Sequence, residues 1–153
     1  MIKLMIADDD AKVRSAITLL LDQDRVCWQV IAEVGNVNEL FIMVEEKKPQ
    51  LLLLDWELPE DRCGDIQPPY YCLKDRIHHL RELNPEMYII VLSSKPQVKS
   101  EALEAGANNF VSKGDPPEFF LNALYALCDK PSMYFVGQPK KKSVHRYFAA
   151  ILL

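Results

Sequence analysis

Long apolar runs and an excess of positive charge are both missing from this sequence. Its apolar runs, such as Leu51–Leu54 and Phe148–Leu153, are short. Both fall far short of the roughly 18 residues that cross a bilayer, so we expect no membrane anchor. Lys and Arg number 18 against 22 Asp and Glu, a formal net charge of −4. Because nucleic-acid-binding modules usually carry clustered positive charge, direct binding of nucleic acid by this chain is disfavoured.

Cysteine is scarce, and its spacing indicates no metal or disulfide framework. The four cysteines, Cys27, Cys63, Cys72 and Cys128, form no C-x-x-C pair. Neither a zinc knuckle nor a disulfide network is therefore predicted. Three carboxylates directly follow the first apolar run, and this start lacks the basic leader and cleavage site of a secretory signal. We expect a cytoplasmic protein in a reducing compartment.

What the sequence does contain is a balanced globular composition. The chain has 153 residues, of which 49% are hydrophobic and 26% charged, and this predicts one domain with a sizeable core. Short apolar runs alternate with segments of helical period, the pattern of βα units that build a parallel α/β sheet with helices on both faces. The expected strands are Ile2–Ala7, Cys27–Val34, Gln50–Leu54, Met87–Leu92 and Asn109–Ser112.

The segments between and after these strands place apolar residues at helical spacing. A fourth helix is expected from Gln97 to Ala105 and ends at Gly106, a residue suited to the left-handed end of a helix. A fifth helix is expected to begin after Asp115, which can cap it. The apolar stripe of the fifth helix is Phe120, Leu124 and Leu127. The stripes of the first, second and third helices are Val13, Ile17, Leu20 and Leu21; Val37, Leu40, Phe41 and Val44; and Leu73, Ile77 and Leu80.

The regular alternation ends near residue 129. Residues 130–142 contain two prolines and the run Lys140–Lys142, which is typical of a solvated linker. In residues 143–153 apolar side chains recur at helical spacing and predict an amphipathic segment. We therefore divide the chain into a domain over residues 1–129, a linker over 130–142 and a C-terminal segment over 143–153. This last segment is a dimerising tail or part of a longer element.

Polar side chains follow four of the expected strands at the point where each strand ends. In open parallel sheets, ligands bind outside the carboxyl ends of the strands, so these side chains are expected to share one edge. Taken alone, the first acidic run suits helix capping equally well. The agreement of several strand ends favours a functional site. The residues are Asp8, Asp9, Asp10, Asp55, Ser93, Ser94 and Lys113.

Several carboxylates in a small volume repel one another unless a cation lies among them. Mg²⁺ suits such a site, because it prefers oxygen ligands and is commonly held by one or two carboxylates together with phosphate oxygens. Lys113 and the Ser93 hydroxyl can then contact a phosphoryl group. The remaining carboxylate can act as the nucleophile, since aspartyl phosphate formation is a known form of covalent catalysis.

Four motifs carry a resemblance to a known family. They are Ile-Ala-Asp-Asp-Asp after the first strand, Leu-Leu-Leu-Leu-Asp-Trp-Glu-Leu-Pro around Asp55, Val-Leu-Ser-Ser, and Gly-Ala-Asn-Asn-Phe-Val-Ser-Lys. In this order and over residues 1 to about 129, the sequence resembles the response-regulator receiver domains of two-component signalling. The resemblance implies a flavodoxin-like (CheY-like), doubly wound sheet of five parallel strands.

The resemblance also assigns roles to the strand-end residues. Asp55 would accept a phosphoryl group from the phosphohistidine of a sensor histidine kinase or of a histidine phosphotransfer protein. Mg²⁺ would be bound by Asp8, Asp9, Asp55 and the backbone carbonyl of Glu57. Lys113 would contact the phosphoryl group. The domain would catalyse only its own phosphorylation and dephosphorylation and would not be an enzyme acting on other molecules.

Two further residues match the family's switch positions. Ser93 would be the switch hydroxyl, and Phe110 the aromatic ring that turns inward when the hydroxyl is drawn toward phosphate. Output would pass through the face formed by the fourth helix, fifth strand and fifth helix, to a downstream protein effector or to an output domain outside this chain. The resemblance is also compatible with a homodimer of this chain.

The sequence departs from the family pattern in three places. Gly114 follows the lysine where proline is common, and the Lys-Gly-Asp form resembles the subgroup with helix-turn-helix outputs. An insertion over residues 60–72, which includes Pro68–Tyr71, is expected to lie beside Asp55. Ser94 stands where a small residue is expected, so access to Asp55 should remain open.

Two other functions remain open at this point. A phosphatase of the haloacid dehalogenase class also begins with a strand followed by Asp-x-Asp, here Asp8 and Asp10, and its nucleophile would be Asp8. Against this alternative, Lys12 stands where Thr or Val is usual, and the chain is short for such a fold. The second alternative is a receiver that serves as an interaction scaffold and is never phosphorylated.

Overall fold

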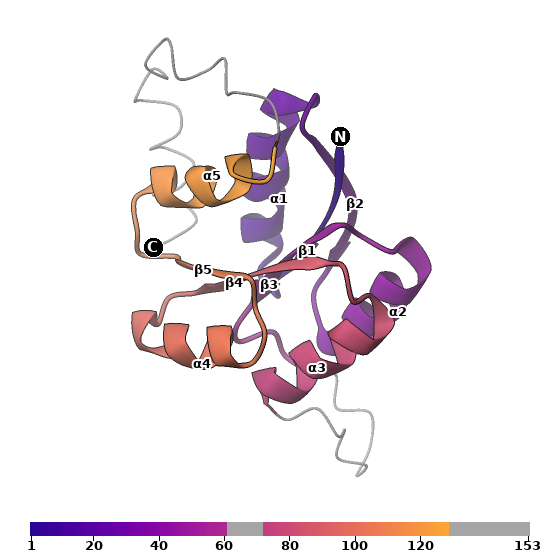
Figure 1. Cartoon of the computed structure of the whole chain (residues 1–153). Helices are drawn as coiled ribbons and strands as arrows, with labels where there is room; N and C mark the ends of the chain where they lie inside the picture. The colour runs from indigo at the N-terminus through magenta and orange to yellow at the C-terminus, as the bar shows by residue number, and fades with distance from the viewer. Residues whose placement is uncertain (61–71, 129–153) are drawn as a thin grey trace.

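The computed structural model describes residues 1–60 and 72–128 (Figure 1), and five strands alternate with five helices in them. Three of the five strands begin and end within one residue of the prediction, and the other two match it in full. Two short 3-10 helices, η1 (Asp22–Asp24) and η2 (Pro96–Val98), interrupt the connections. The main elements are β1 (Ile2–Ala7), α1 (Ala11–Leu21), β2 (Trp28–Val34), α2 (Val37–Lys47), β3 (Leu51–Asp55), α3 (Leu73–Leu83), β4 (Tyr88–Ser93), α4 (Lys99–Glu104), β5 (Asn109–Ser112) and α5 (Pro117–Tyr125).

The five strands form one parallel sheet in the order β2-β1-β3-β4-β5. Helices α1 and α5 cover one face, and α2, α3 and α4 cover the other (Figure 1). This is the doubly wound, flavodoxin-like fold that the sequence predicts. The order matters for the site, because β1 and β3 are neighbours and Ala7 pairs with Leu54 at their carboxyl ends.

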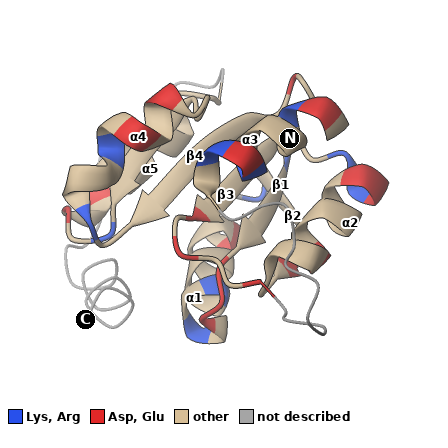
Figure 2. Ribbon diagram, turned by 90° about the horizontal axis from the view of Figure 1, so that it is seen from below, with Lys and Arg blue, Asp and Glu red and all other residues tan. Residues whose placement is uncertain are grey.

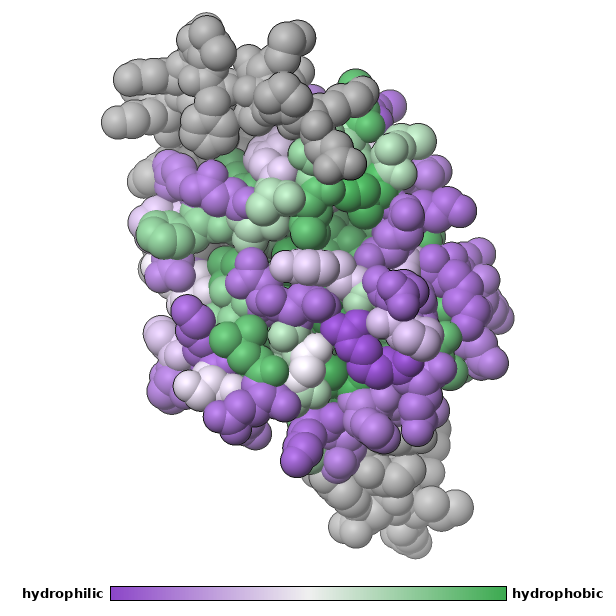
Figure 3. Space-filling model, viewed as in Figure 1, coloured by the Kyte–Doolittle hydropathy of each residue, from purple (hydrophilic) through white to green (hydrophobic). Residues whose placement is uncertain are grey.

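Two apolar clusters hold the helices to the sheet. In β3, Leu51 and Leu53 point into the cluster under α1 and α5, while Leu52 and Leu54 point into the cluster under α2, α3 and α4. All four leucines are fully buried, as expected for a central strand covered on both faces. In Figure 3 hydrophilic residues cover most of the lower half of the visible surface, and hydrophobic residues gather more in its upper half, where Figure 1 shows α1 and α5.

The ends of the helices confirm some predicted signals and correct others. Asp10 caps α1 through a hydrogen bond from the Lys12 N–H at 2.8 Å. Gly106 follows α4 with a φ of 107°, a conformation that favours glycine. The prediction that Asp115 caps α5 is wrong, because Pro116 takes the cap position and no side chain caps the helix. The fourth helix is also shorter than predicted, since its first turn is the 3-10 helix η2.

The cysteines give the largest correction to the sequence-based picture. Cys27, which precedes β2, is joined to Cys128, which follows α5, by a disulfide across 101 positions of the chain. The prediction of no disulfide is therefore wrong for this pair. The spacing of the cysteines could not reveal it, because only the packing of α5 beside the start of β2 brings the two sulfurs together.

Several predictions lie outside the described residues, namely the insertion around Pro68–Tyr71, the linker 130–142 and the segment 143–153. Within residues 1–60 and 72–128, no helix has the length and apolar character that crossing a membrane requires. Basic and acidic residues both occur along the helices (Figure 2). The prediction of no direct nucleic-acid binding stays a prediction.

Candidate functional site

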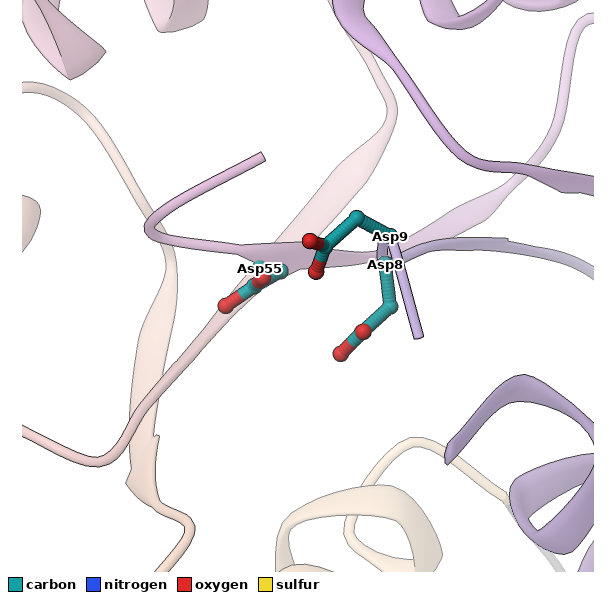
Figure 4. Close-up of side chains that lie close together, drawn as sticks. All are labelled: Asp8, Asp9 and Asp55. Atoms are coloured by element: carbon teal, nitrogen blue, oxygen red, sulfur yellow. The ribbon is translucent and has the colours of Figure 1, made fainter. Parts of the chain in front are cut away.

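Three carboxylates meet at the carboxyl end of the sheet (Figure 4). Asp8 and Asp9 follow β1, and Asp55 is the last residue of β3. One oxygen from each lies within 4.8 Å of the others. Asp8 is 1% and Asp55 5% exposed, whereas Asp9 is exposed. The cluster is therefore buried at Asp8 and Asp55 and open to solvent at Asp9.

Lys113 brings positive charge to the buried carboxylates. It follows β5, and its backbone N–H donates to the Ser93 carbonyl at 2.7 Å, which ties it to the end of β4. Its Nζ donates to Asp8 Oδ2 at 2.8 Å and to Asp55 Oδ1 at 3.1 Å. One ammonium group thus bridges residues from two neighbouring strands.

The same contacts shift the pKa values of Asp55 and Lys113. Burial raises the pKa of Asp55, and the nearby Asp8 charge adds to this, while the charge of Lys113 and hydrogen bonds from Lys113 and the Glu57 N–H only partly oppose it. Burial would lower the pKa of Lys113, but its hydrogen bonds and attraction to Asp8 and Asp55 raise it. The site therefore holds a charged ammonium beside carboxylates that are costly to ionise together.

Asp10 does not join the cluster. Its carboxylate accepts from the Lys12 N–H as the cap of α1, and its own N–H donates to Asp8 Oδ1 at 2.9 Å. The acidic run therefore divides into a capping residue and two candidate metal ligands. Residue type alone left these two roles open for the whole run, whereas the family resemblance assigned metal binding to Asp8 and Asp9.

The hydroxyl and aromatic candidates lie on the adjacent strands. Ser93 ends β4, is almost fully buried, and its Oγ accepts from the Lys95 N–H at 3.0 Å. Ser94 is exposed, and open access to Asp55 past it stays a prediction. Phe110 in β5 is buried in the cluster under α2, α3 and α4. Its switch motion stays a prediction.

The structure adds two residues that the sequence analysis missed. Lys95 pairs with Glu57, so an ion pair links the loop after β4 to the loop after Asp55. Arg76 of α3 is buried and donates to the Leu58 carbonyl at 2.7 Å. Arg76 had a signal in the sequence, because it interrupts the apolar stripe of α3 with a charge. Lys95 had none beyond its proximity to Ser93.

The three carboxylates fit a small divalent cation. Oxygens on opposite sides of a Mg²⁺ octahedron are about 4 Å apart, and the span of 4.8 Å in this cluster is close to that. Asp8 and Asp55 are also held in place by Lys113. The Glu57 carbonyl stays a predicted ligand.

Comparison with known proteins gives the family. The family model of the response regulator receiver domain matches residues 4–124, and the chain belongs to this family of two-component signalling domains. The phosphate regulon transcriptional regulatory protein PhoB of Pseudomonas aeruginosa is 28% identical over 126 residues, covering 81% of this chain and 50% of that protein. The oxygen regulatory protein NreC of Staphylococcus haemolyticus is 27% identical over 124 residues, covering 80% and 52%.

A solved structure agrees with both the fold and the family. The isolated receiver domain of RcsB from Salmonella enterica serovar Typhimurium superposes with a TM-score of 0.68 and 26% identity, over 82% of this chain and 87% of that one. It was determined in the presence of the phosphomimetic BeF3⁻. The chain spans about half the length of PhoB and NreC.

Proposed function

We propose that this receiver domain is phosphorylated on Asp55 in a Mg²⁺-dependent reaction, with a sensor histidine kinase or a histidine phosphotransfer protein as the donor. The observation that carries the proposal is the bridge from Lys113 Nζ to Asp8 and Asp55 inside the carboxylate cluster. A structural salt bridge needs one carboxylate, whereas this cluster holds three, and two of them contact the Lys113 ammonium. The excess of acid is explained by a bound divalent cation.

In the proposed reaction, an Asp55 carboxylate oxygen attacks the phosphorus of a phosphohistidine, a P–O bond forms and the P–N bond breaks. Lys113 then contacts the phosphoryl oxygens, and the Ser93 hydroxyl donates to them from the end of β4. When bound, Mg²⁺ held by Asp8, Asp9, Asp55 and the Glu57 carbonyl supplies charge neutralisation for the transferring group. Water later hydrolyses the acyl phosphate slowly and restores Asp55.

The signal would leave through the surface of α4, β5 and α5. Movement of Ser93 toward phosphate makes room for the Phe110 ring, and this couples the site to that surface. Recipients are a downstream protein effector or an output domain outside residues 1–129. RcsB has been determined bound to promoter DNA in the presence of BeF3⁻, which supports a transcriptional output as one such recipient. We place this system in the cytoplasm.

Asp55→Asn tests the proposal directly. With acetyl phosphate and Mg²⁺, the unmodified protein should gain one phosphoryl group that is labile to alkali and hydroxylamine, detected by intact mass spectrometry, and Asp55→Asn should gain none. EDTA should abolish the labelling. Asp10→Asn is the matched control, because Asp10 caps α1 outside the cluster, and it should be labelled normally. Unchanged labelling of Asp55→Asn would overturn the assignment.

Two further measurements separate the remaining alternatives. Turnover of a phosphate ester that survives Asp55→Asn but is lost in Asp8→Asn would indicate a phosphatase with Asp8 as nucleophile. The absence of Mg²⁺ affinity, together with no change on adding beryllofluoride, would indicate an interaction scaffold. Either result would replace the proposed phosphorylation switch.

A further inference from the structure

The disulfide between Cys27 and Cys128 lies at the end of the sheet opposite the carboxylate cluster. Cys27 directly precedes the first residue of β2, whereas Asp55 is the last residue of β3. The Cα atoms of the two cysteines are 6.1 Å apart, within the usual range of roughly 4.4–6.8 Å. Both backbone segments are therefore placed for a cross-link without rearrangement.

Noncovalent contacts hold the same junction. The ring of Trp28 meets the ring of Tyr125 edge-on, with centroids 6.1 Å apart. The Ile2 N–H donates to the Cys27 carbonyl at 2.7 Å, and the Cys128 N–H donates to the Tyr125 carbonyl at 3.1 Å. Since the Trp28–Tyr125 contact joins the two segments without the sulfur bond, we expect the two thiols of a reduced protein to remain side by side.

The fold also does not need the bond to form a core. The two apolar clusters run through the whole sheet and bury every residue of β3. A single domain of this size normally folds on its hydrophobic core alone. Reduction of the pair is therefore compatible with a folded protein, and this is the condition for a cross-link that opens and closes.

We propose that Cys27 and Cys128 form a reversible disulfide that responds to low-molecular-weight disulfides of the glutathione type. Cys27 is only 5% exposed, whereas Cys128 is partly exposed, so Cys128 reacts first. Its thiolate attacks one sulfur of the small disulfide, which releases one thiolate and leaves a mixed disulfide on Cys128. The Cys27 thiolate then attacks Cys128 Sγ and releases the second. The protein loses two electrons and two protons, and the small disulfide becomes two thiols.

The proposed bond changes the end of α5 and not the carboxylate cluster. In the oxidised form, Cys128 is fixed covalently to the start of β2, so the turn Ala126–Cys128 cannot separate from the sheet. In the reduced form, this turn is held without a covalent link, by its own hydrogen bonds, by the packing of Leu127 and Cys128 against the apolar cluster and by the Trp28–Tyr125 contact. The proposal is independent of phosphorylation, because none of its groups contacts Asp55 or Lys113.

A redox titration of the full chain tests the proposal. In a Cys63→Ser/Cys72→Ser background only Cys27 and Cys128 remain, and oxidised and reduced glutathione are mixed in varied ratios. Peptide mapping should find the Cys27–Cys128 link at oxidising ratios and free thiols at reducing ratios. The closed loop is long, so the oxidised form should melt on the order of 10 °C higher than the reduced form. Amide exchange at Ala126 and Leu127 should be slower in the oxidised form.

Two single variants in the same background test the order of the steps. Cys27→Ser should stop at a mixed disulfide with glutathione on Cys128. Cys128→Ser should leave Cys27 unmodified while the protein is folded, and neither variant should show the shift in melting temperature. The proposal is overturned if no link forms at any ratio, if excess reduced glutathione fails to open the link in the folded protein, or if Cys27 is the residue that carries glutathione.

Discussion

At the scale of single residues, the charge of the site depends on few groups. Lys113 is the ammonium that contacts both buried carboxylates. Lys95 and Glu57 form a second ion pair at the outer side, with both side chains half exposed. The Lys113 contacts are the stronger ones, because buried charges are strongly coupled, whereas the exposed Lys95–Glu57 pair is screened by solvent.

Lys95→Gln should slow phosphorylation with little effect on folding. Without Lys95, the Glu57 carboxylate is no longer neutralised beside an already acidic site, and an anionic donor is repelled. We expect labelling by acetyl phosphate to slow a few-fold at low salt, and the free energy of unfolding to change by less than about 1 kcal/mol. Phosphorylation rates and urea unfolding measure the two effects.

The control for this prediction is Glu57→Gln/Lys95→Gln, which removes both charges and should restore most of the rate. Raising the salt concentration should shrink the difference, because exposed charges are screened. Equal rates in the unmodified protein and in Lys95→Gln at low salt would show that the ion pair does not affect donor approach.

The site could be predicted in part from the sequence. Asp8, Asp55 and Lys113 were found because each directly follows a strand, and strand ends converge in a parallel sheet. The pairing of Lys95 with Glu57 was not found, because it depends on the path of two loops. Residue type could not separate the capping role of Asp10 from metal binding, since both favour the same residue type, and only the family resemblance left Asp10 out of the metal ligands.

At the scale of elements, one arginine joins α3 to the turn between α4 and β5. Arg81 donates to the Gly106 carbonyl at 2.9 Å and to Asn108 Oδ1 at 2.6 Å. It also donates to the carbonyls of Pro85 and Met87, which precede β4. Several backbone carbonyls of two loops therefore share one guanidinium group.

Arg81→Ala should destabilise the domain by about 2–3 kcal/mol, because charged hydrogen bonds are lost and their acceptors are left without this donor. Arg81→Lys should recover only part of this loss, since an ammonium group lacks the planar fork of donors. Urea unfolding gives the free energies. Lys74→Ala on the exposed side of α3 is the control and should change stability by less than about 0.5 kcal/mol.

If Arg81→Ala unfolds at the same urea concentration as the unmodified protein, its hydrogen bonds carry no net stabilisation. If Lys74→Ala lowered the free energy of unfolding as much as Arg81→Ala, the loss would instead reflect a general effect of charge on α3.

The type and order of the elements could be predicted, but some of their ends could not. Apolar periodicity was sufficient for Val13, Ile17, Leu20 and Leu21, all of which are buried in α1. The start of α5 was placed one residue early, because Asp115 is a good cap by type but Pro116 occupies the cap position. The Cys27–Cys128 pair was missed because contacts across the fold are absent from local spacing.

At the scale of the whole molecule, the charged cluster links stability to pH. Burial and the neighbouring Asp8 raise the pKa of Asp55 above 3.8. Between 3.8 and this raised value, the folded protein binds more protons than the unfolded chain. The contribution of Asp55 is therefore fully present below pH 3.8 and is lost as the pH rises through the folded pKa.

Asp55→Asn should consequently gain stability relative to the unmodified protein as the pH rises from about 4 to 7 in EDTA. Adding Mg²⁺ at pH 7 should stabilise the unmodified protein more than the variant, because bound cation offsets the charge of Asp55. Urea unfolding at several pH values measures both. A constant difference across this pH range would show that Asp55 titrates normally.

Lys113 adds a separate limit at high pH. Its pKa is raised above 10.5 by Asp8 and Asp55 despite burial. Its contribution to stability is thus complete below 10.5 and is lost only as the pH rises through the folded value. The acidic and basic partners of one cluster therefore affect the unfolding free energy in different pH ranges.

Helix α5 is restrained near both of its ends, by the hydrogen bonds of the turn containing Lys113 on one side and by the sulfur bridge of Cys128 on the other. Because the disulfide holds the C-terminal end of α5 against the sheet, a displacement near Lys113 would tilt the helix rather than shift it along its axis. Reduction of the disulfide would free the C-terminal end of α5. The geometry of any motion in α5 would then depend on the oxidation state of two sulfur atoms at the opposite end of the domain.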